Sequence, residues 1–150
     1  MIVEITDSTK KEQITLEILR DLPEWFGIES SIIEYSEAVK EMPFFVYKIG
    51  DEAAGFIALK CSTSCDMHVL GIKKHYHRQG YGKEMIDYAE NYARSLGMKY
   101  MTVKTLSDDH PDENYKKTRK FYESLGYDHL EVFPTLWGEE NPCLYMIKVL

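Results

Sequence analysis

The stretch that decides the fold is residues 70–83, which read LGIKKHYHRQGYGK. An apolar strand ends here, a short basic loop follows, and a helix begins at Gly80 and Gly82. The start of a helix leaves backbone N–H groups unpaired and carries the positive end of the helix dipole. Glycines let an anion approach those N–H groups, and Arg78 and Lys83 add positive charge. The segment therefore predicts a pyrophosphate-binding loop, with a plain glycine-rich turn bearing basic surface residues as the alternative.

Predicted strands and helices follow one another on both sides of this loop. From their periodicity we expect strands at 2–5, 44–49, 54–60, 66–72, 100–105, 129–132 and 144–149. We expect one helix at 8–19 behind a Ser or Thr cap and a second, capped by Ser30 or Ser31, that runs to Val39. Two more are expected from Gly80 to Leu96 and from Asp112 or Asn114 to Leu125. The order predicts one α/β domain over residues 1–150, with a mixed sheet and helices on its faces.

The composition is that of an ordinary globular protein, with 44% hydrophobic residues in a chain of 150. No apolar run approaches the roughly 18 residues that span a bilayer, and the first residues are unlike a signal peptide. We therefore expect a cytoplasmic protein that does not bind a membrane. With 25 acidic against 18 basic residues and a net charge of -7, we do not expect it to bind nucleic acid.

The three cysteines, Cys61, Cys65 and Cys143, include no C-x-x-C pair. No His or acidic residues cluster with them at the spacing of a zinc site. We therefore expect three reduced, mostly buried thiols and no metal.

Two motifs carry a resemblance to a known family. Residues 77–82, HRQGYG, resemble the acetyl-CoA loop of the GCN5-related N-acetyltransferases (GNAT), usually written [QR]-x-x-G-x-[GA]. Residues 121–127, FYESLGY, are similar to the F-Y-x-x-x-G-[FY] ending of a later helix in that family. His77 departs from the usual Gln or Arg at the first loop position. The resemblance implies acetyl-CoA as co-substrate and a GNAT fold, a mixed sheet of about six or seven strands splayed in a V and flanked by about four helices.

The resemblance also implies which residues bind acetyl-CoA. Backbone groups of Leu70 and Ile72 would pair with the pantetheine arm like an added strand, and N–H groups from Arg78 to Lys83 would hold the pyrophosphate. Asn114 matches a common cofactor contact, and a helix N-cap is its alternative role. The expected cofactor-binding residues are Leu70, Gly71, Ile72, His77, Arg78, Gln79, Gly80, Tyr81, Gly82, Lys83 and Asn114.

Acetylation of an amine needs a group that takes a proton from the amine and a group that protonates the departing thiolate. Tyr122 matches the tyrosine that acts as this acid in many family members, and a buried core aromatic is its alternative role. Asp66 and His68 alternate along the strand before the loop, and so share one face. Their strand resembles that of arylalkylamine acetyltransferases, where two histidines relay a proton. A solvated Asp and a hydrogen-bonded His are the alternative.

Aromatic side chains beside carboxylates at 23–27 and 133–140 suit an ammonium group. We expect Trp25, Phe26 and Trp137 to bind the acceptor, with a lid or a dimer contact as the alternative. The acidic residues at 108–113 are expected to form a solvated loop.

The sequence thus predicts an enzyme, an N-acetyltransferase that lets a primary amine, such as that of a small molecule, attack acetyl-CoA directly in a ternary complex. Alternatives are a CoA-binding sensor, a protein (N-terminal or lysine) acetyltransferase and a nucleotide-phosphate binder. A homodimer is a further expectation.

Overall fold

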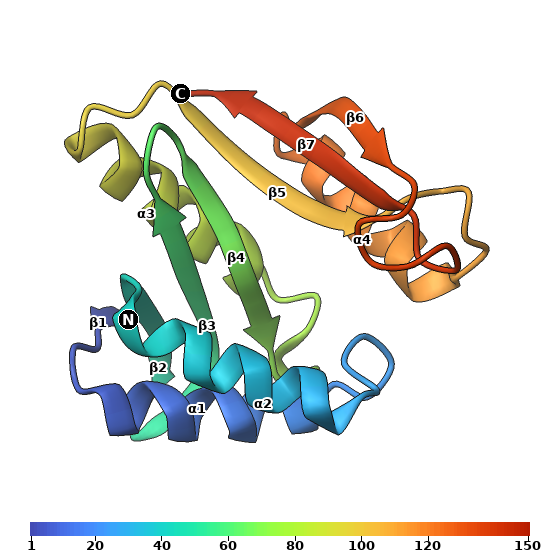
Figure 1. Ribbon diagram of the computed structural model, residues 1–150. Helices are drawn as coiled ribbons and strands as arrows, with labels where there is room; N and C mark the ends of the chain where they lie inside the picture. The colour runs from blue at the N-terminus through green and yellow to red at the C-terminus, as the bar shows by residue number, and fades with distance from the viewer. The chain divides into compact units, whose positions relative to one another are not determined.

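The computed structural model describes all residues from 1 to 150. The chain forms two compact units (Figure 1). The first unit holds Met1–Lys60 and Met67–Tyr92, and the second holds Cys61–Asp66 and Ala93–Leu150. In chain order the elements are β1 (Ile2–Glu4), α1 (Ser8–Arg20), α2 (Glu29–Ala38), η1 (Val39–Glu41), β2 (Phe44–Ile49), β3 (Glu52–Cys61), β4 (Cys65–Ile72), η2 (Lys74–Tyr76), α3 (Tyr81–Ser95), β5 (Tyr100–Leu106), α4 (Glu113–Ser124), β6 (Asp128–Phe133) and β7 (Cys143–Val149).

Hydrogen bonds link the strands into a seven-stranded sheet in the order β1-β2-β3-β4-β5-β7-β6. The β4–β5 ladder is parallel, whereas the β1–β2, β2–β3, β5–β7 and β6–β7 ladders are antiparallel. This mixed sheet with four α-helices confirms the predicted fold class, and every predicted helix and strand is present.

In the first unit, alternation along β2 sends side chains to two different helix layers. Phe44 and Val46 belong to a hydrophobic cluster with Ile18 of α1 and Ile32 of α2. Phe45 faces the other way, and its ring lies 5.1 Å from that of Tyr88 and 5.0 Å from that of Tyr92 in α3. Helices α1 and α2 therefore cover one face of β2, and α3 covers the opposite face.

The helix ends correct three predictions. The side chain of Asp7, rather than a Ser or Thr, caps α1 by accepting a hydrogen bond from the N–H group of Lys10 at 2.9 Å. Helix α2 starts after Ile28, which makes no side-chain cap bond, so the predicted serine cap is wrong. Leu96 lies beyond the end of α3 and is 48% exposed, because the left-handed backbone of Gly97 ends the helix there.

In the second unit, β5, β7 and β6 form an antiparallel sheet with α4 on one face. His129 of β6 stands directly opposite Met146 of β7, and its Nε2 lies 2.9 Å from a carboxylate oxygen of Glu123 in α4. The face that carries His129 and Met146 is therefore the one that α4 covers. Tyr122 and Tyr127 are buried at the end of this helix, with ring centres 6.0 Å apart.

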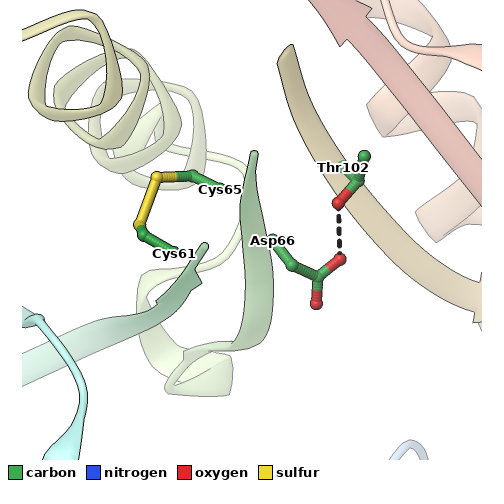
Figure 2. Close-up of a disulfide and its surroundings, with 4 residues drawn as sticks. All are labelled: Cys61, Cys65, Asp66 and Thr102. Carbon is green, nitrogen blue, oxygen red and sulfur yellow. Dashed lines mark hydrogen bonds between the residues drawn. A yellow bond between two sulfur atoms is a disulfide. The ribbon is translucent and has the colours of Figure 1, made fainter. Parts of the chain in front are cut away.

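The prediction that all thiols are reduced is wrong for one pair. Cys61 at the end of β3 and Cys65 at the start of β4 form a disulfide (Figure 2). The tight turn between the two strands brings their Cα atoms to 4.1 Å, a closeness that the sequence spacing alone did not reveal. Cys143 is a free, buried thiol, as expected. None of the helices has both the length and the apolar character that a membrane span requires.

Candidate active site

The start of α3 leaves a row of backbone N–H groups without a partner. From Arg78 through Lys83 these groups donate no hydrogen bond within the chain, and the first bond of the helix runs from Glu84 to the carbonyl oxygen of Gly80 at 3.1 Å. Arg78 and Gly80 have left-handed backbones, with φ of 61° and 85°, which turn the loop into the helix. The loop therefore offers an anion a run of donors at the positive end of a helix.

Most of the lysines around this loop are already paired with carboxylates. Lys73, Lys74 and Lys83 all take part in ion pairs, and Lys83 lies 2.9 Å from Asp87 on its own helix. The hydrogen bond to Asp87 raises the pKa of Lys83. Arg78, in contrast, is exposed and makes no ion pair in the chain. Of the two cations that the sequence assigned to the loop, Arg78 is thus the one whose charge is uncompensated.

His77 braces the loop through its side chain. Its Nε2 lies 2.6 Å from the carbonyl oxygen of Ile72, the last residue of β4. The His77 ring also meets Trp25 edge-on, with ring centres 5.7 Å apart. This side-chain contact holds the loop against the strand end. It uses one of the two lone pairs of the Ile72 carbonyl oxygen, a group that the family resemblance assigns to pantetheine.

Gly71 has a packing reason to be glycine. A Cβ atom at this position would lie 3.0 Å from Cγ2 of Ile18, 3.2 Å from the ring of Phe56 and 3.4 Å from Leu19. Strand β4 therefore passes directly beneath α1 only because this residue has no side chain.

Asp66 is held by polar groups of β5. The hydroxyl of Thr102 donates to Oδ1 of Asp66 at 2.8 Å, as Figure 2 shows, and Nζ of Lys104 lies 3.9 Å from the same oxygen. Thr102 is also paired with Asp66 in the short parallel ladder between β4 and β5. Sequence analysis missed Thr102 and Lys104, although their alternation along the strand is the same signal that drew attention to Asp66.

His68 lies in the first unit, two residues further along β4. Its ring meets that of Tyr35 in α2 edge-on, with centres 5.6 Å apart. Burial alternates strictly along β4, in agreement with the predicted alternation, and its half-buried members are Asp66, His68, Leu70 and Ile72.

Tyr122 is buried in the second unit, so its alternative role as a core aromatic is compatible with its position. Burial raises the pKa of Tyr122 well above its ordinary value, and Tyr115 and the negative charge of Asp66 raise it further. The phenol therefore keeps its proton at neutral pH, as a general acid must before it acts. Phe121 beside it is only half-buried, so the inward position belongs to Tyr122.

Asn114 is not the cap of α4. Asp112 caps this helix, because its Oδ1 accepts from the N–H groups of Asn114 at 2.8 Å and Tyr115 at 3.0 Å. The Asn114 side chain is thus not needed at the helix end. Part of the acidic loop is therefore structural, and a pocket of about 300 Å³ opens beside it, lined by Asp108, His110, Pro111, Asp112, Glu113, Lys116 and Arg119.

Arg119 was not predicted to have a role from the sequence. Its side chain is buried, and Nη1 donates to the carbonyl oxygen of Leu106 at 2.7 Å. A charged residue in the middle of an otherwise polar helix gives no sequence signal of such burial, and its contact fixes α4 to the end of β5.

The predicted acceptor residues differ in exposure. Trp25 and Phe26 are half-buried and pack against the hydrophobic cluster of the first unit. The Phe26 ring meets Tyr35 edge-on at 5.8 Å. Trp137, in the segment between β6 and β7, is 42% exposed. The first unit thus carries the phosphate loop, His68, Trp25 and Phe26, and the second carries Asp66, Asn114, Tyr122 and Trp137.

Solved structures share this fold at low sequence identity. An aminoglycoside 6'-N-acetyltransferase complexed with coenzyme A is 23% identical, with a TM-score of 0.75 over 99% of this chain and 96% of that one. An aminoglycoside 6'-N-acetyltransferase from Enterococcus faecium is 20% identical, with a TM-score of 0.76 and the same coverage. An IAA acetyltransferase from Bacillus cereus is 17% identical, with a TM-score of 0.75 over 100% of this chain and 99% of that one.

Sequence comparison settles the family. None of the curated proteins matches the chain significantly. A family model described as the acetyltransferase (GNAT) domain matches residues 40–129, which is more than half of the chain and includes both motifs. The protein therefore belongs to the GNAT acetyltransferase family and is an acetyltransferase.

Proposed function

We propose that the whole chain is one acetyl-CoA-dependent N-acetyltransferase domain that acetylates a primary amine by direct attack in a ternary complex. The observation that carries the proposal is the run of unpartnered N–H groups from Arg78 to Lys83 at the start of α3. Such a run is suited to a diphosphate, because it supplies many donors and the positive end of a helix dipole together.

The residues present fit acetyl-CoA. The diphosphate would be held by the loop N–H groups and by the uncompensated charge of Arg78, and the pantetheine arm would follow β4 near Leu70. Asn114 would add a side-chain contact, since Asp112 already caps its helix. The bound thioester supplies the acetyl group, and the chain's own residues supply proton transfers and orientation.

The chemistry divides among three side chains. Asp66, fixed by Thr102, would orient the ammonium group of the acceptor, and His68 would take its proton because imidazole titrates near neutrality. The amine nitrogen then forms a bond to the thioester carbonyl carbon, and the carbon–sulfur bond breaks. The departing sulfur takes the phenol proton of Tyr122, which the raised pKa keeps in place. The nitrogen carries an extra proton after the attack and releases it as the amide forms, which returns the phenolate of Tyr122 to its acid form. Trp25, Phe26 and Trp137 would contribute aromatic surface for the acceptor.

Calorimetry with acetyl-CoA, followed by a free-thiol release assay with a panel of amines, tests the proposal. We expect acetyl-CoA to bind and ATP at the same concentration not to compete, since the loop lacks the Walker spacing. We expect thiol release only when an amine is present. Binding without release for any amine would refute the catalytic proposal, and failure to bind acetyl-CoA would refute the role of the loop.

A variant of Arg78 sharpens the test. Arg78→Ala removes the uncompensated cation of the loop, and Lys83→Ala removes a cation that Asp87 already neutralises. We expect the affinity for acetyl-CoA to fall more in the first variant than in the second. Equal affinities would show that charge at Arg78 does not contribute.

A further inference from the structure

Lys104 places an ammonium group next to Asp66 and makes no hydrogen bond with it. Its Nζ lies 4.8 Å from the centre of the Tyr145 ring, and Tyr145 is its direct partner across the β5–β7 ladder. The distance of 3.9 Å to Asp66 is an ion pair but too long for a hydrogen bond. Apart from these two groups, only the buried thiol of Cys143 interacts electrostatically with this ammonium. Its N–H donors are therefore available to a ligand.

Neighbouring residues fix the position of the Lys104 side chain. Helix α4 covers the face of the second-unit sheet that carries Met146, and Tyr145, the residue before it, points to the opposite face. Lys104 is paired with Tyr145 and therefore lies on that opposite face. The ring of Tyr145 is in turn supported by Phe133 of β6, with ring centres 5.9 Å apart. A cation held over an aromatic ring is kept in place while its charge stays accessible, and the side chain of Lys104 is 35% exposed.

The charges around this position limit what can approach it. Asp66 is the carboxylate nearest to Lys104, and the pair compensates itself. Glu131, opposite Tyr145 in the β6–β7 ladder, also lies on this face. A polycationic acceptor would place positive charge against Lys104, which costs energy. An acceptor with an amine for Asp66 and a carboxylate for Lys104 would satisfy both groups.

We propose that Lys104 determines acceptor specificity by binding a carboxylate of the acceptor, so that the substrate class is amino-carboxylates rather than polyamines. The inference rests on the proposed function in one respect, because it takes Asp66 to lie at the acceptor amine. Lys104 does not touch the reacting atoms and acts on binding, not on the chemical step.

The test compares free amino acids with their own carboxamides, and with spermine, as acceptors in the thiol-release assay. We expect the wild-type protein to favour the acids in kcat/KM by about 10- to 100-fold, the usual value of a hydrogen bond to a charged group. In Lys104→Met this preference should vanish through a higher KM for the acids, with KM for the amides unchanged. Lys148→Met is the matched control, since Lys148 also lies over a tyrosine ring, that of Tyr127, at 5.6 Å.

The outcomes separate this inference from the proposed function. Wild-type acetylation of amides or spermine as efficiently as acids would overturn the role of Lys104 and leave the N-acetyltransferase standing. An equal loss for acids and amides in Lys104→Met, at unchanged melting temperature, would show that Lys104 only positions Asp66. Absence of acetyl transfer to every amine would overturn both proposals together.

Discussion

The Nε2 atom of His77 lies 2.6 Å from the carbonyl oxygen of Ile72, so the first residue of the phosphate loop is anchored to the last residue of β4. The ring does what a glutamine amide or an arginine guanidinium can also do, namely donate a hydrogen bond to this carbonyl. Although His77 differs from the Gln or Arg of the family pattern, it still supplies a hydrogen-bond donor to the carbonyl oxygen of Ile72.

Loss of this anchor should weaken cofactor binding. We expect His77→Ala to lower the affinity for acetyl-CoA about tenfold, because the loop must then be ordered by the ligand itself. His77→Gln should retain most of the affinity. Calorimetry measures both, with His75→Ala as control, since His75 is exposed and contacts only neighbouring loop residues through its ring. A loss in His75→Ala as large as in His77→Ala would contradict the anchoring role.

Tyr122→Phe should lower kcat by about 100-fold or more, with little change in KM, if the phenol protonates the thiolate. Tyr127→Phe is the control, because it removes the hydroxyl of the adjoining buried tyrosine. The raised pKa of Tyr122 also fixes the sign of the pH dependence. The phenol stays protonated up to a pH above the ordinary tyrosine pKa of about 10. Ionisation of Tyr122 should therefore cause no fall in kcat below about pH 10. Such a fall that disappears in Tyr122→Phe would contradict this account.

The number of reactive thiols tests the predicted state of the three cysteines. Under denaturing, non-reducing conditions we expect one reactive thiol, Cys143, and after reduction we expect three. In the native state Cys143 should react slowly, because burial raises the pKa of its thiol to about 11 and so keeps it neutral near pH 8. Three thiols in the denatured protein without reductant would show that the disulfide is absent.

The disulfide should also contribute to stability. Closing a loop as short as that from Cys61 to Cys65 stabilises the folded state by about 2 kcal/mol through the entropy of the unfolded chain. We expect the double variant Cys61→Ser and Cys65→Ser to unfold at lower urea concentration by that amount. Reductant should lower the midpoint of the wild-type protein but not that of the variant, and an unchanged wild-type midpoint would count against the effect.

Gly71→Ala should destabilise the fold by about 1–3 kcal/mol, the usual cost of overpacking. The added methyl would lie 3.0 Å from Cγ2 of Ile18. Leucine lacks that branch, so Ile18→Leu should restore part of the stability lost in Gly71→Ala. Urea unfolding of the two single variants and the double variant measures this coupling. Strict additivity would mean that the predicted contact does not determine the cost.

The hydrophobic periodicity of the sequence was sufficient to predict the helices and strands, because strands repeat every two residues and helices every 3.6. The two motifs were sufficient for the family. Contacts between strands were not predictable in this way. Thr102 and Lys104 became relevant only when the β4–β5 ladder placed Thr102 beside Asp66. The disulfide depends on how closely a turn returns the chain, and the half-buried position of Trp25 depends on packing against distant residues.

The alternation along β4 has a consequence for how this sequence can vary. Asp66 and His68 occupy the half-buried positions, and Met67 and Val69 occupy the buried ones. A single inserted or deleted residue between Cys65 and Asp66 would exchange these sets along the whole strand, turning polar groups into the core and methionine out of it. The segment between β6 and β7 has no such constraint, because its residues from 134 to 141 are exposed. Changes of chain length during evolution should therefore accumulate there, while β4 admits only replacements at constant length.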